Sequence, residues 1–423
     1  MTAAYPALPI RVLYVVYWGA AEPLGRSLVL PTVARLAEGG VDLTLATFDK
    51  AGDYEDRARM AQIRASLEES GVAWLPLRYH KRPRLPATAF DVLHGWARGI
   101  AARVRAPIDV VHARTFVGGL IGLLLAPTLR ARLVYHNEGF YPDEQVDGGF
   151  WPAGSVPHRI TKAVESALYA RADGLIALSH RAGRVLEELP AVRRRGTPVI
   201  VVPSCVDLDL FGARESPERA LSAGLKFVYT GTVGGRYELD RIGRFVALAA
   251  REVPGVRLTV LTRAEPALVQ EMLGRGGVPR DLWSLGCLPH EAMPGELRRH
   301  DVGLFFLARG TSEHGCSPTK IGEYWACGLP VVTTPNASDT DEIILRERVG
   351  VVVRDHSEPE YRRAIVELRA LLNDPELSRR CRVAAEEHYA LRPAVERQLA
   401  LYRELLGPRI TPAATTRAAA KGC

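Results

Sequence analysis

Short β-branched and apolar runs alternate with longer amphipathic stretches along most of this sequence. Ile10–Tyr17 is a nearly continuous apolar run, as expected of a strand that is buried on both faces of a parallel sheet. A glycine-containing loop follows at 19–25, then a helical stretch over 27–38 and a second strand over 41–48. This alternation is typical of βα units, and it predicts an α/β fold of doubly wound parallel sheets.

The alternation forms two series, and a chain of 423 residues is long for one domain. The first series has further strands expected at 72–77, 109–112, 133–136, 174–178 and 199–202. The second has strands expected at 227–231, 256–262, 302–307, 330–334 and 349–353. We therefore expect domains over 1–205 and 206–393, with a ligand cleft between the carboxyl ends of their sheets. We expect a helix over 394–407 to cross back to the first domain, and a disordered tail over 408–423.

Two further segments stand out between the predicted strands. Residues 137–157 form a long irregular stretch rich in Gly, Pro and acidic residues, and loops of this length usually have a function. The net charge is +7, and basic residues gather over Arg78–Arg105, where Asp91 is the one acidic residue. Such a patch attracts phosphates, anionic lipid headgroups or nucleic acid, and a solvated surface is the alternative. We expect a peripheral contact with the inner membrane surface and no nucleic-acid partner.

The cysteines and the amino terminus indicate a cytoplasmic protein. The six cysteines form no C-x-x-C pair, which favours free thiols in a reducing compartment. MTAAYPALPIRVLYVVYWG lacks a basic region and a small-residue cleavage site, so we interpret it as a first strand and not as a signal peptide. The most apolar later segment, Val117–Ala126, is much shorter than the ~20 residues that span a bilayer.

The segment 314–338, HGCSPTKIGEYWACGLPVVTTPNAS, carries the clearest chemistry. Ser317-Pro318-Thr319 is typical of a helix start, with Pro318 expected at an early helical position. Free N–H groups, the Ser317 hydroxyl and the Lys320 ammonium are expected to converge there on a diphosphate. Glu323 lies one turn later, where its carboxylate suits ribose hydroxyls; an ordinary amphipathic helix with a Lys–Glu pair is the alternative.

Within this segment, SPTKIGEYWACGLPVV resembles the donor-binding signature of glycosyltransferase family 4, in the subgroup whose motif reads S-x-x-K-x-x-E-Y-x-A-x-G-x-P-V. Four other segments resemble landmarks of that family in the same order: VLYVVYWGAAEPLGRS, VVPSCVDLDLF, FVYTGTVGGRYEL and LGCLPHEAMPGELRRHDVGLFFL. The resemblance implies the GT-B fold, in which two Rossmann-like domains face each other across a cleft.

Donor-binding residues follow from the resemblance position by position. It implies diphosphate contacts from Ser317, Thr319 and Lys320, with Glu323 on the ribose. Gly231 and Thr232 would lie beside the phosphates, and Gly25 would let the amino-terminal loop approach the donor.

The catalytic residue implied by the resemblance is His136 in LVYHNEGF, which matches the histidine thought to hydrogen-bond the transferred sugar; a buried structural histidine is the alternative. His112 in VVHAR is a second candidate, and Arg236 is the nearest cation in the loop after the first strand of the second domain. Gly315, next to His314, stands where many family members have a Glu that contacts the donor sugar. The resemblance therefore does not imply which sugar this chain transfers.

The resemblance implies a retaining, hexosyltransferase-type enzyme that uses a nucleotide-diphosphate sugar and needs no metal ion or other cofactor. We interpret the D-x-D at 339–341 as acidic residues of a helix start and not as metal ligands. The acceptor is expected to be a glycan or a lipid-linked molecule, in bacterial surface polysaccharide or glycoconjugate biosynthesis. A nucleotide-sugar epimerase of the same fold and a non-catalytic nucleotide-sugar-binding protein are the alternatives.

Overall fold

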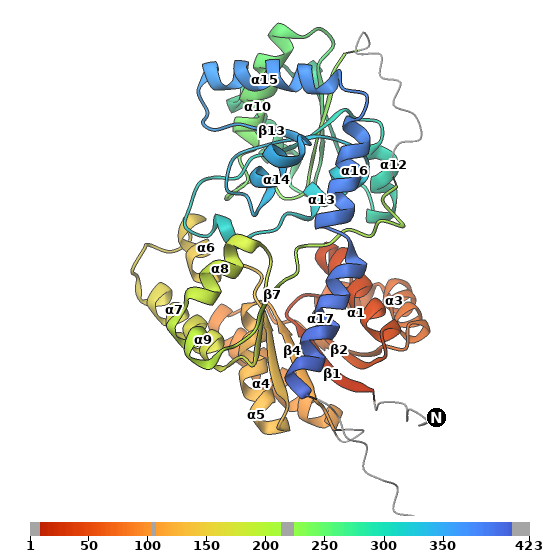
Figure 1. Ribbon diagram of the computed structural model, residues 1–423, viewed down its shortest axis with the longest axis vertical. Helices are drawn as coiled ribbons and strands as arrows, with labels where there is room; N and C mark the ends of the chain where they lie inside the picture. Colours follow the sequence, from red (N-terminus) through yellow and green to blue (C-terminus); the bar gives the residue numbers. More distant parts are fainter. Residues whose placement is uncertain (1–8, 104–106, 213–223, 408–423) are drawn as a thin grey trace, which may run out of the picture.

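A computed structural model describes residues 9–103, 107–212 and 224–407. The predicted tail over 408–423, Arg105 and part of the predicted domain junction lie outside the described residues. The described chain forms two domains, each with a twisted parallel sheet between helices (Figure 1). The predicted pair of doubly wound α/β domains is confirmed.

The first domain is built on a seven-stranded sheet in the order β3-β2-β1-β4-β5-β6-β7, and neighbouring strands are parallel throughout. Its strands are β1 (Ile10–Val16), β2 (Val41–Asp49), β3 (Ala73–Arg78), β4 (Val110–Arg114), β5 (Arg132–His136), β6 (Gly174–Ala177) and β7 (Val199–Val201). The chain reverses its direction of winding between β1 and β4, the point at which doubly wound sheets bind ligands at their carboxyl edge.

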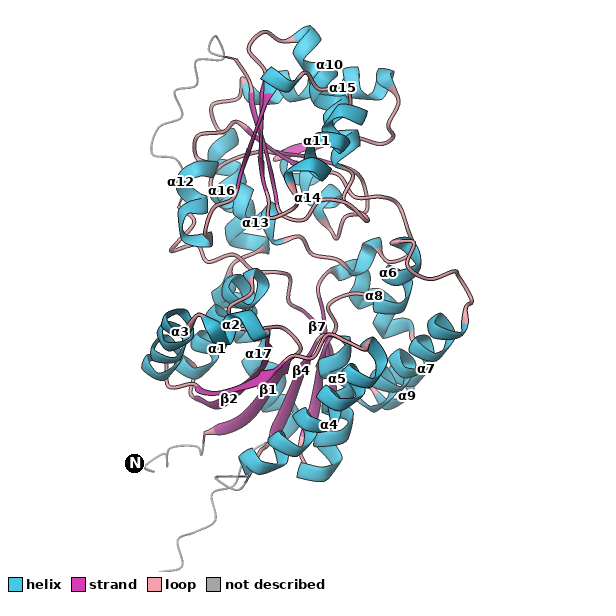
Figure 2. Ribbon diagram, turned by 180° about the vertical axis from the view of Figure 1, so that it is seen from behind, coloured by secondary structure: helices cyan, strands magenta, loops and turns pink. Residues whose placement is uncertain are grey.

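Helices cover both faces of this sheet. They are α1 (Leu30–Glu38), α2 (Ala51–Glu55), α3 (Arg57–Glu69), α4 (Arg84–Arg103), α5 (Phe116–Leu129), α6 (Tyr141–Asp147), α7 (Val156–Arg171), α8 (His180–Glu188) and α9 (Pro190–Arg195). One buried cluster joins the sheet to α1 and α3, and another joins its opposite face to α5, α7 and α8 (Figure 2). Both faces of the central strands are thus removed from water, as their continuous apolar runs predicted.

The second domain repeats this winding with six strands in the order β10-β9-β8-β11-β12-β13. Its strands are β8 (Lys226–Thr230), β9 (Arg257–Leu261), β10 (Trp283–Gly286), β11 (Val302–Phe305), β12 (Val331–Thr333) and β13 (Gly350–Val352). Its helices are α10 (Leu239–Glu252), α11 (Pro266–Arg275), α12 (Met293–Leu297), α13 (Thr319–Ala326), α14 (Thr340–Glu347), α15 (Glu358–Leu372) and α16 (Leu377–His388). They enclose one continuous core.

The last helix, α17 (Leu391–Leu406), leaves the second domain and packs on the first (Figure 1). Its buried side chains Ala394, Val395, Leu399, Leu401 and Tyr402 join the core beside α1. Nearby, the Val206 N–H donates to the Tyr389 carbonyl at 2.8 Å, so the two chain crossings between the domains lie side by side. No helix among the described residues is long and apolar enough to cross a membrane.

Two local expectations were wrong. The segment 137–157 is not wholly irregular, because α6 forms at Tyr141, where Pro142 occupies the first turn of the helix. The helix expected from Ser27 begins as a π-helix, η1 (Gly25–Val29), and becomes α-helical only at Leu30. The predicted bounds of the listed strands otherwise agree with the structure to within two residues.

Replacing Leu401 by Ala is expected to destabilise the first domain by ~2–5 kcal/mol, because the side chain is 1% exposed and packs over Gly174 at the start of β6. Urea unfolding measures the loss. Glu404→Ala, on the exposed side of the same helix, should change stability by less than about 0.5 kcal/mol. Equal small effects would show that α17 does not belong to this core.

Candidate active site

The loop and helix after β11 form one half of the site. Pro318 is the N-cap of α13 and so lies just before the helix, not within its first turn as predicted. Thr319 is the first helical residue. The first N–H groups of a helix have no helical partner, and Pro318 has no side-chain oxygen with which to cap them. The Ser204 N–H, from the segment that joins the two domains, donates to the Ser317 hydroxyl oxygen at 3.0 Å. Ser317 is therefore held at the boundary between the domains.

Lys320 is buried at the start of α13, with 8% of its surface exposed. Its ammonium nitrogen lies 4.9 Å from each ring centroid of Tyr229, Tyr237 and Phe305. Aromatic faces attract a cation, but they replace only part of its hydration. Burial accordingly lowers the pKa of Lys320 to about 8, against the opposing effect of Glu323. An anionic ligand would supply a negative charge beside this buried ammonium.

Glu323 lies one helical turn after Lys320 and is 9% exposed. Burial raises the pKa of this carboxyl group to about 7, and the neighbouring Lys320 opposes the rise. The nearest ring nitrogen is His290 Nδ1, at 4.0 Å from Glu323 Oε1. On an ordinary amphipathic helix, Lys320 and Glu323 would lie on the solvated face. Both side chains are buried here, which favours a ligand site over that alternative.

Gly231 leaves room for the Lys320 side chain. Its φ is +106°, and a Cβ atom there would lie 2.8 Å from the Lys320 ammonium. Thr232 follows with an exposed side chain, and its carbonyl accepts a hydrogen bond from the Tyr229 hydroxyl. The structure therefore brings Gly231, Lys320 and Glu323 together, with Thr319 partly exposed at the helix start.

Gly25 has a local reason to be glycine. A Cβ atom at this position would lie 2.2 Å from the Gly19 carbonyl oxygen and 2.9 Å from that of Ala20. The amino-terminal loop folds tightly against its own backbone there, so glycine is required with or without a ligand.

A chain of side chains at the carboxyl edge of the first sheet forms the other half of the site. His136 ends β5, and His112 lies two residues before the end of the neighbouring strand β4; their Nδ1 and Nε2 atoms, respectively, lie 3.2 Å apart. His112 Nδ1 lies 2.6 Å from the Tyr402 hydroxyl of α17, and the His112 ring stacks on Tyr14. Burial lowers the pKa of both histidines well below the ordinary value, and the Arg114 charge adds to this. Both rings are therefore neutral.

The hydrogen bonds of these neutral rings couple the proton position on one histidine to that on the other. If the Tyr402 hydroxyl donates to His112 Nδ1, His112 Nε2 carries a proton and donates to His136 Nδ1. His136 Nε2 then carries the remaining proton. This atom is buried and has no hydrogen-bond partner in the described residues. A buried N–H without a partner is costly, so His136 is ready to donate to a bound ligand.

Arg114 and Glu138 complete this half, and sequence reasoning missed them. They form a close ion pair, and Glu138 Oε1 lies 3.5 Å from His136 Nε2. The Arg114 guanidinium also lies 5.6 Å from the ring centroid of Trp18. Arg114 follows His112 by two residues within β4, the spacing that places side chains on one face of a strand, and Glu138 follows His136 by two residues just beyond β5. That spacing was the available signal.

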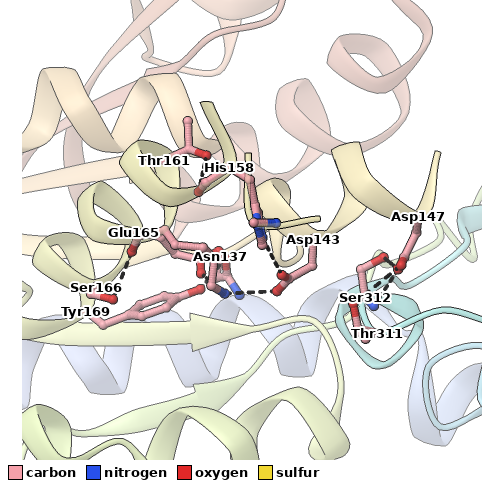
Figure 3. Close-up of polar contacts among 12 residues, drawn as sticks. Asn137, Asp143, Asp147, His158, Thr161, Glu165, Ser166, Tyr169, Thr311 and Ser312 are labelled. Atoms are coloured by element: carbon pink, nitrogen blue, oxygen red, sulfur yellow. Dashed lines mark hydrogen bonds and ion pairs between the residues drawn. The ribbon is translucent and has the colours of Figure 1, made fainter. Parts of the chain in front are cut away.

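Arg236, a candidate donor contact in the sequence, bridges the two domains in this structure. It donates to the Ser312 hydroxyl at 2.6 Å and lies 3.4 Å from Glu144 of α6. Ser312 in turn donates its N–H and hydroxyl to Asp147, at 2.8 and 2.6 Å, as Figure 3 shows. Although partial burial opposes it, these bonds hold the pKa of Asp147 below its ordinary value. The segment 137–157 thus carries a contact between the domains.

Asp339 is the N-cap residue of α14, as its predicted place at a helix start requires, but its carboxylate does not cap that helix. It accepts the N–H groups of His180 and Arg181 at 2.6 and 3.1 Å, at the start of α8 in the other domain. Arg181 of the first domain also forms an ion pair with Asp341, at 3.0 Å. The D-x-D acids therefore bind the first domain.

The short helix η5 (Glu313–Gly315) explains the missing glutamate. A Cβ atom on Gly315 would lie 2.9 Å from the Phe140 ring and 3.0 Å from the Gly139 Cα atom. A longer side chain does not fit between the domains in this arrangement. The His314 carbonyl accepts a hydrogen bond from the Ser179 hydroxyl at 2.6 Å. The buried Nδ1 atom of the His314 ring has no hydrogen-bond partner in the described residues.

Two doubly wound domains in tandem, one with a buried lysine at a helix start and the other with two buried histidines, have the architecture of the GT-B class. Two family models match the chain: Glycosyltransferase Family 4 over residues 28–210, and Glycosyl transferases group 1 over residues 225–370. The chain belongs to glycosyltransferase family 4, as the motif predicted.

Comparison with curated protein sequences gives no match. Among solved structures, the chain is similar to a glycosyltransferase from Rickettsia africae, with 13% identity, TM-score 0.66, and 95% of this chain and 100% of that chain covered. Sucrose-phosphate synthase from Thermosynechococcus elongatus has 15% identity and TM-score 0.67, with coverage of 94% and 99%. Anabaena HepE in complex with UDP-glucose has 15% identity and TM-score 0.61, with coverage of 92% and 99%. These likenesses confirm the predicted GT-B fold.

The stability of the ligand-free protein is expected to depend on pH through Lys320 and Glu323. Because the pKa of Glu323 rises from 4.5 to about 7 on folding, its contribution is lost as the pH rises through this range. Because the pKa of Lys320 falls from 10.5 to about 8, its contribution is regained between about 8 and 10.5, by at most about 3 kcal/mol. Urea unfolding measures both limbs. Lys320→Met should lose the alkaline limb, and an unchanged alkaline limb would contradict the burial of this ammonium.

Proposed function

We propose that this glycosyltransferase moves a sugar from a nucleoside diphosphate sugar to a glycan or lipid-linked acceptor, with retention of anomeric configuration and without a metal ion. The buried Lys320 ammonium at the start of α13 carries this proposal, since a diphosphate is the anion that suits such a position. HepE, a structural neighbour, has been crystallised with UDP and with UDP-glucose, which makes UDP-sugars the first donors to test.

In the proposed reaction the bond between the anomeric carbon and the diphosphate oxygen breaks, and the acceptor hydroxyl oxygen bonds to the same carbon. The acceptor proton passes to the departing phosphate, which stays on the face of attack, so the configuration is retained. Lys320, the Ser317 hydroxyl and the first N–H groups of α13 stabilise the negative charge of the leaving group. Glu323, in its ionised form, accepts hydrogen bonds from the ribose hydroxyls.

The proposed role of His136 follows from its buried Nε2 atom, which has no hydrogen-bond partner among the described residues. It donates a hydrogen bond to a hydroxyl of the transferred sugar and so positions the anomeric carbon. The contacts of Arg236, Asp147 and Asp339 between the domains hold the two halves of the site together. A closed cleft excludes water and so limits hydrolysis of the donor.

We place this reaction on the cytoplasmic side of a bacterial inner membrane, in surface polysaccharide or glycoconjugate biosynthesis. The basic residues that start at Arg78 support this setting, because they suit an acceptor with a phosphate group or an anionic glycan.

The first test is a thermal-shift panel of UDP-, GDP-, ADP- and dTDP-sugars. A donor at about 100 times its dissociation constant adds ~2.7 kcal/mol of stability. One nucleotide should stabilise the wild type and Lys226→Ala, whose lysine is exposed at the start of β8, but not Lys320→Ala. No shift for folded wild type with any of these donors would overturn the proposal.

A product assay separates the proposal from its alternatives. A transferase releases nucleoside diphosphate at a rate that depends on the acceptor, and we expect this rate to survive EDTA. Conversion of the donor without acceptor would instead indicate an epimerase. Donor binding without turnover in any acceptor mixture would indicate a binding protein.

His136→Ala is expected to lower kcat by about 10²–10⁴-fold with little change in donor affinity, since its contact forms on the reacting sugar. Tyr402→Phe removes the hydroxyl that fixes the tautomer of His112 and should cost about tenfold. Steady-state kinetics measure both variants. Wild-type kcat in His136→Ala would exclude this histidine from the reaction.

A further inference from the structure

The outer surface of α4 carries apolar side chains where a surface helix normally carries polar ones. Leu85, Phe90 and Leu93 are 84%, 54% and 57% exposed. The opposite face is already used, because Cβ atoms on Gly95 and Gly99 would lie within about 3 Å of Ile121 and Leu125 of α5. The outer apolar face is therefore additional to the one that packs on the core.

The apolar surface continues onto α5 and the segment from α6 to α7. Of the 13 large hydrophobic side chains exposed among the described residues, seven lie on these elements: Leu85, Phe90, Leu93, Leu124, Phe150, Val156 and Ile160. The helices α4, α5 and α7 pack in one layer on the same face of the first sheet (Figure 2). The six others are spread over both domains.

The charges of this layer have one sign. Lys81, Arg82, Arg84, Arg98 and Arg159 are exposed around the apolar residues. The acidic residues within α4, α5 and α7 are Asp91 and Glu165, and both are buried. Asp91 is also engaged by the Tyr17 hydroxyl and by His80. Exposed apolar side chains surrounded by cations are the pattern that binds an anionic lipid surface.

The layer adjoins the half of the site that the first domain supplies. Tyr17, directly after β1, donates to Asp91 in the second turn of α4 at 2.7 Å. The next residue, Trp18, has its ring beside the Arg114 guanidinium that pairs with Glu138. Only a short chain of contacts thus separates the exposed face of α4 from His136 and its neighbours.

We propose that the outer face of α4, continued by α5 and the α6–α7 segment, docks on an anionic lipid bilayer. Docking would present a membrane-held acceptor to the first domain; this part rests on the proposed transferase function. The docking itself needs only the apolar and cationic side chains. We infer that the acceptor is an amphiphile with an apolar anchor and an anionic head, and not a free soluble sugar.

The test is flotation of the full chain with vesicles of phosphatidylglycerol and phosphatidylcholine, compared with phosphatidylcholine alone. We expect binding to the anionic vesicles that weakens between about 0.1 M and about 0.5 M salt. Phe90→Ser with Leu93→Ser should lower the partition coefficient at least about tenfold. The matched double variant Leu345→Ser with Val366→Ser, exposed in the second domain, should bind as the wild type does.

The controls separate this proposal from the proposed function. The thermal shift with the donor should be the same in both double variants and in the wild type, which shows that they fold and bind nucleotide sugar. Absence of wild-type binding to anionic vesicles, or equal losses in the two double variants, would overturn the docking even if the donor binds. Vesicle binding without any donor shift would overturn the proposed function and leave the docking in place.

Discussion

A lysine ammonium buried at a helix start is the constraint on which the rest of this structure depends. Lys320 fits there because Gly231, with φ +106°, leaves room beside it, and because β8 and β11 supply aromatic rings around it. Glu323 compensates only in part for the hydration that Lys320 loses on burial, so an anionic ligand would further stabilise the ammonium. We propose that the local instability of the ligand-free site favours the binding of a diphosphate.

The second half of the site depends on the return of α17 to the first domain. Its Tyr402 contacts His112, and His112 contacts His136, so the last helix of the chain supports the position of His136. The segments 137–157 and 339–341 add polar contacts between the two domains. Three distant parts of the sequence thus contribute to holding the domains together.

Most of the fold and half of the site could be predicted from sequence. Buried parallel strands leave continuous apolar runs, and the residues of α13 lie close together in the chain, so a motif records them. The roles of Arg114, Glu138 and Asp339 could not be derived in this way, because they depend on pairing between separate elements. The carboxylate of Asp339 caps a helix 159 residues earlier, and no local pattern encodes such a partner. The close contact of Gly25 with Gly19 could not be predicted either, because it forms only when the loop has folded.

A crystal structure of the complex with the nucleotide sugar selected by the thermal-shift panel tests the central claim most directly. The account predicts that the diphosphate lies within hydrogen-bond distance of Lys320 Nζ and the start of α13, with the ribose hydroxyls on Glu323. It also predicts a hydroxyl of the sugar on His136 Nε2. A nucleotide bound away from α13, or a diphosphate that leaves Lys320 without a contact, would contradict it.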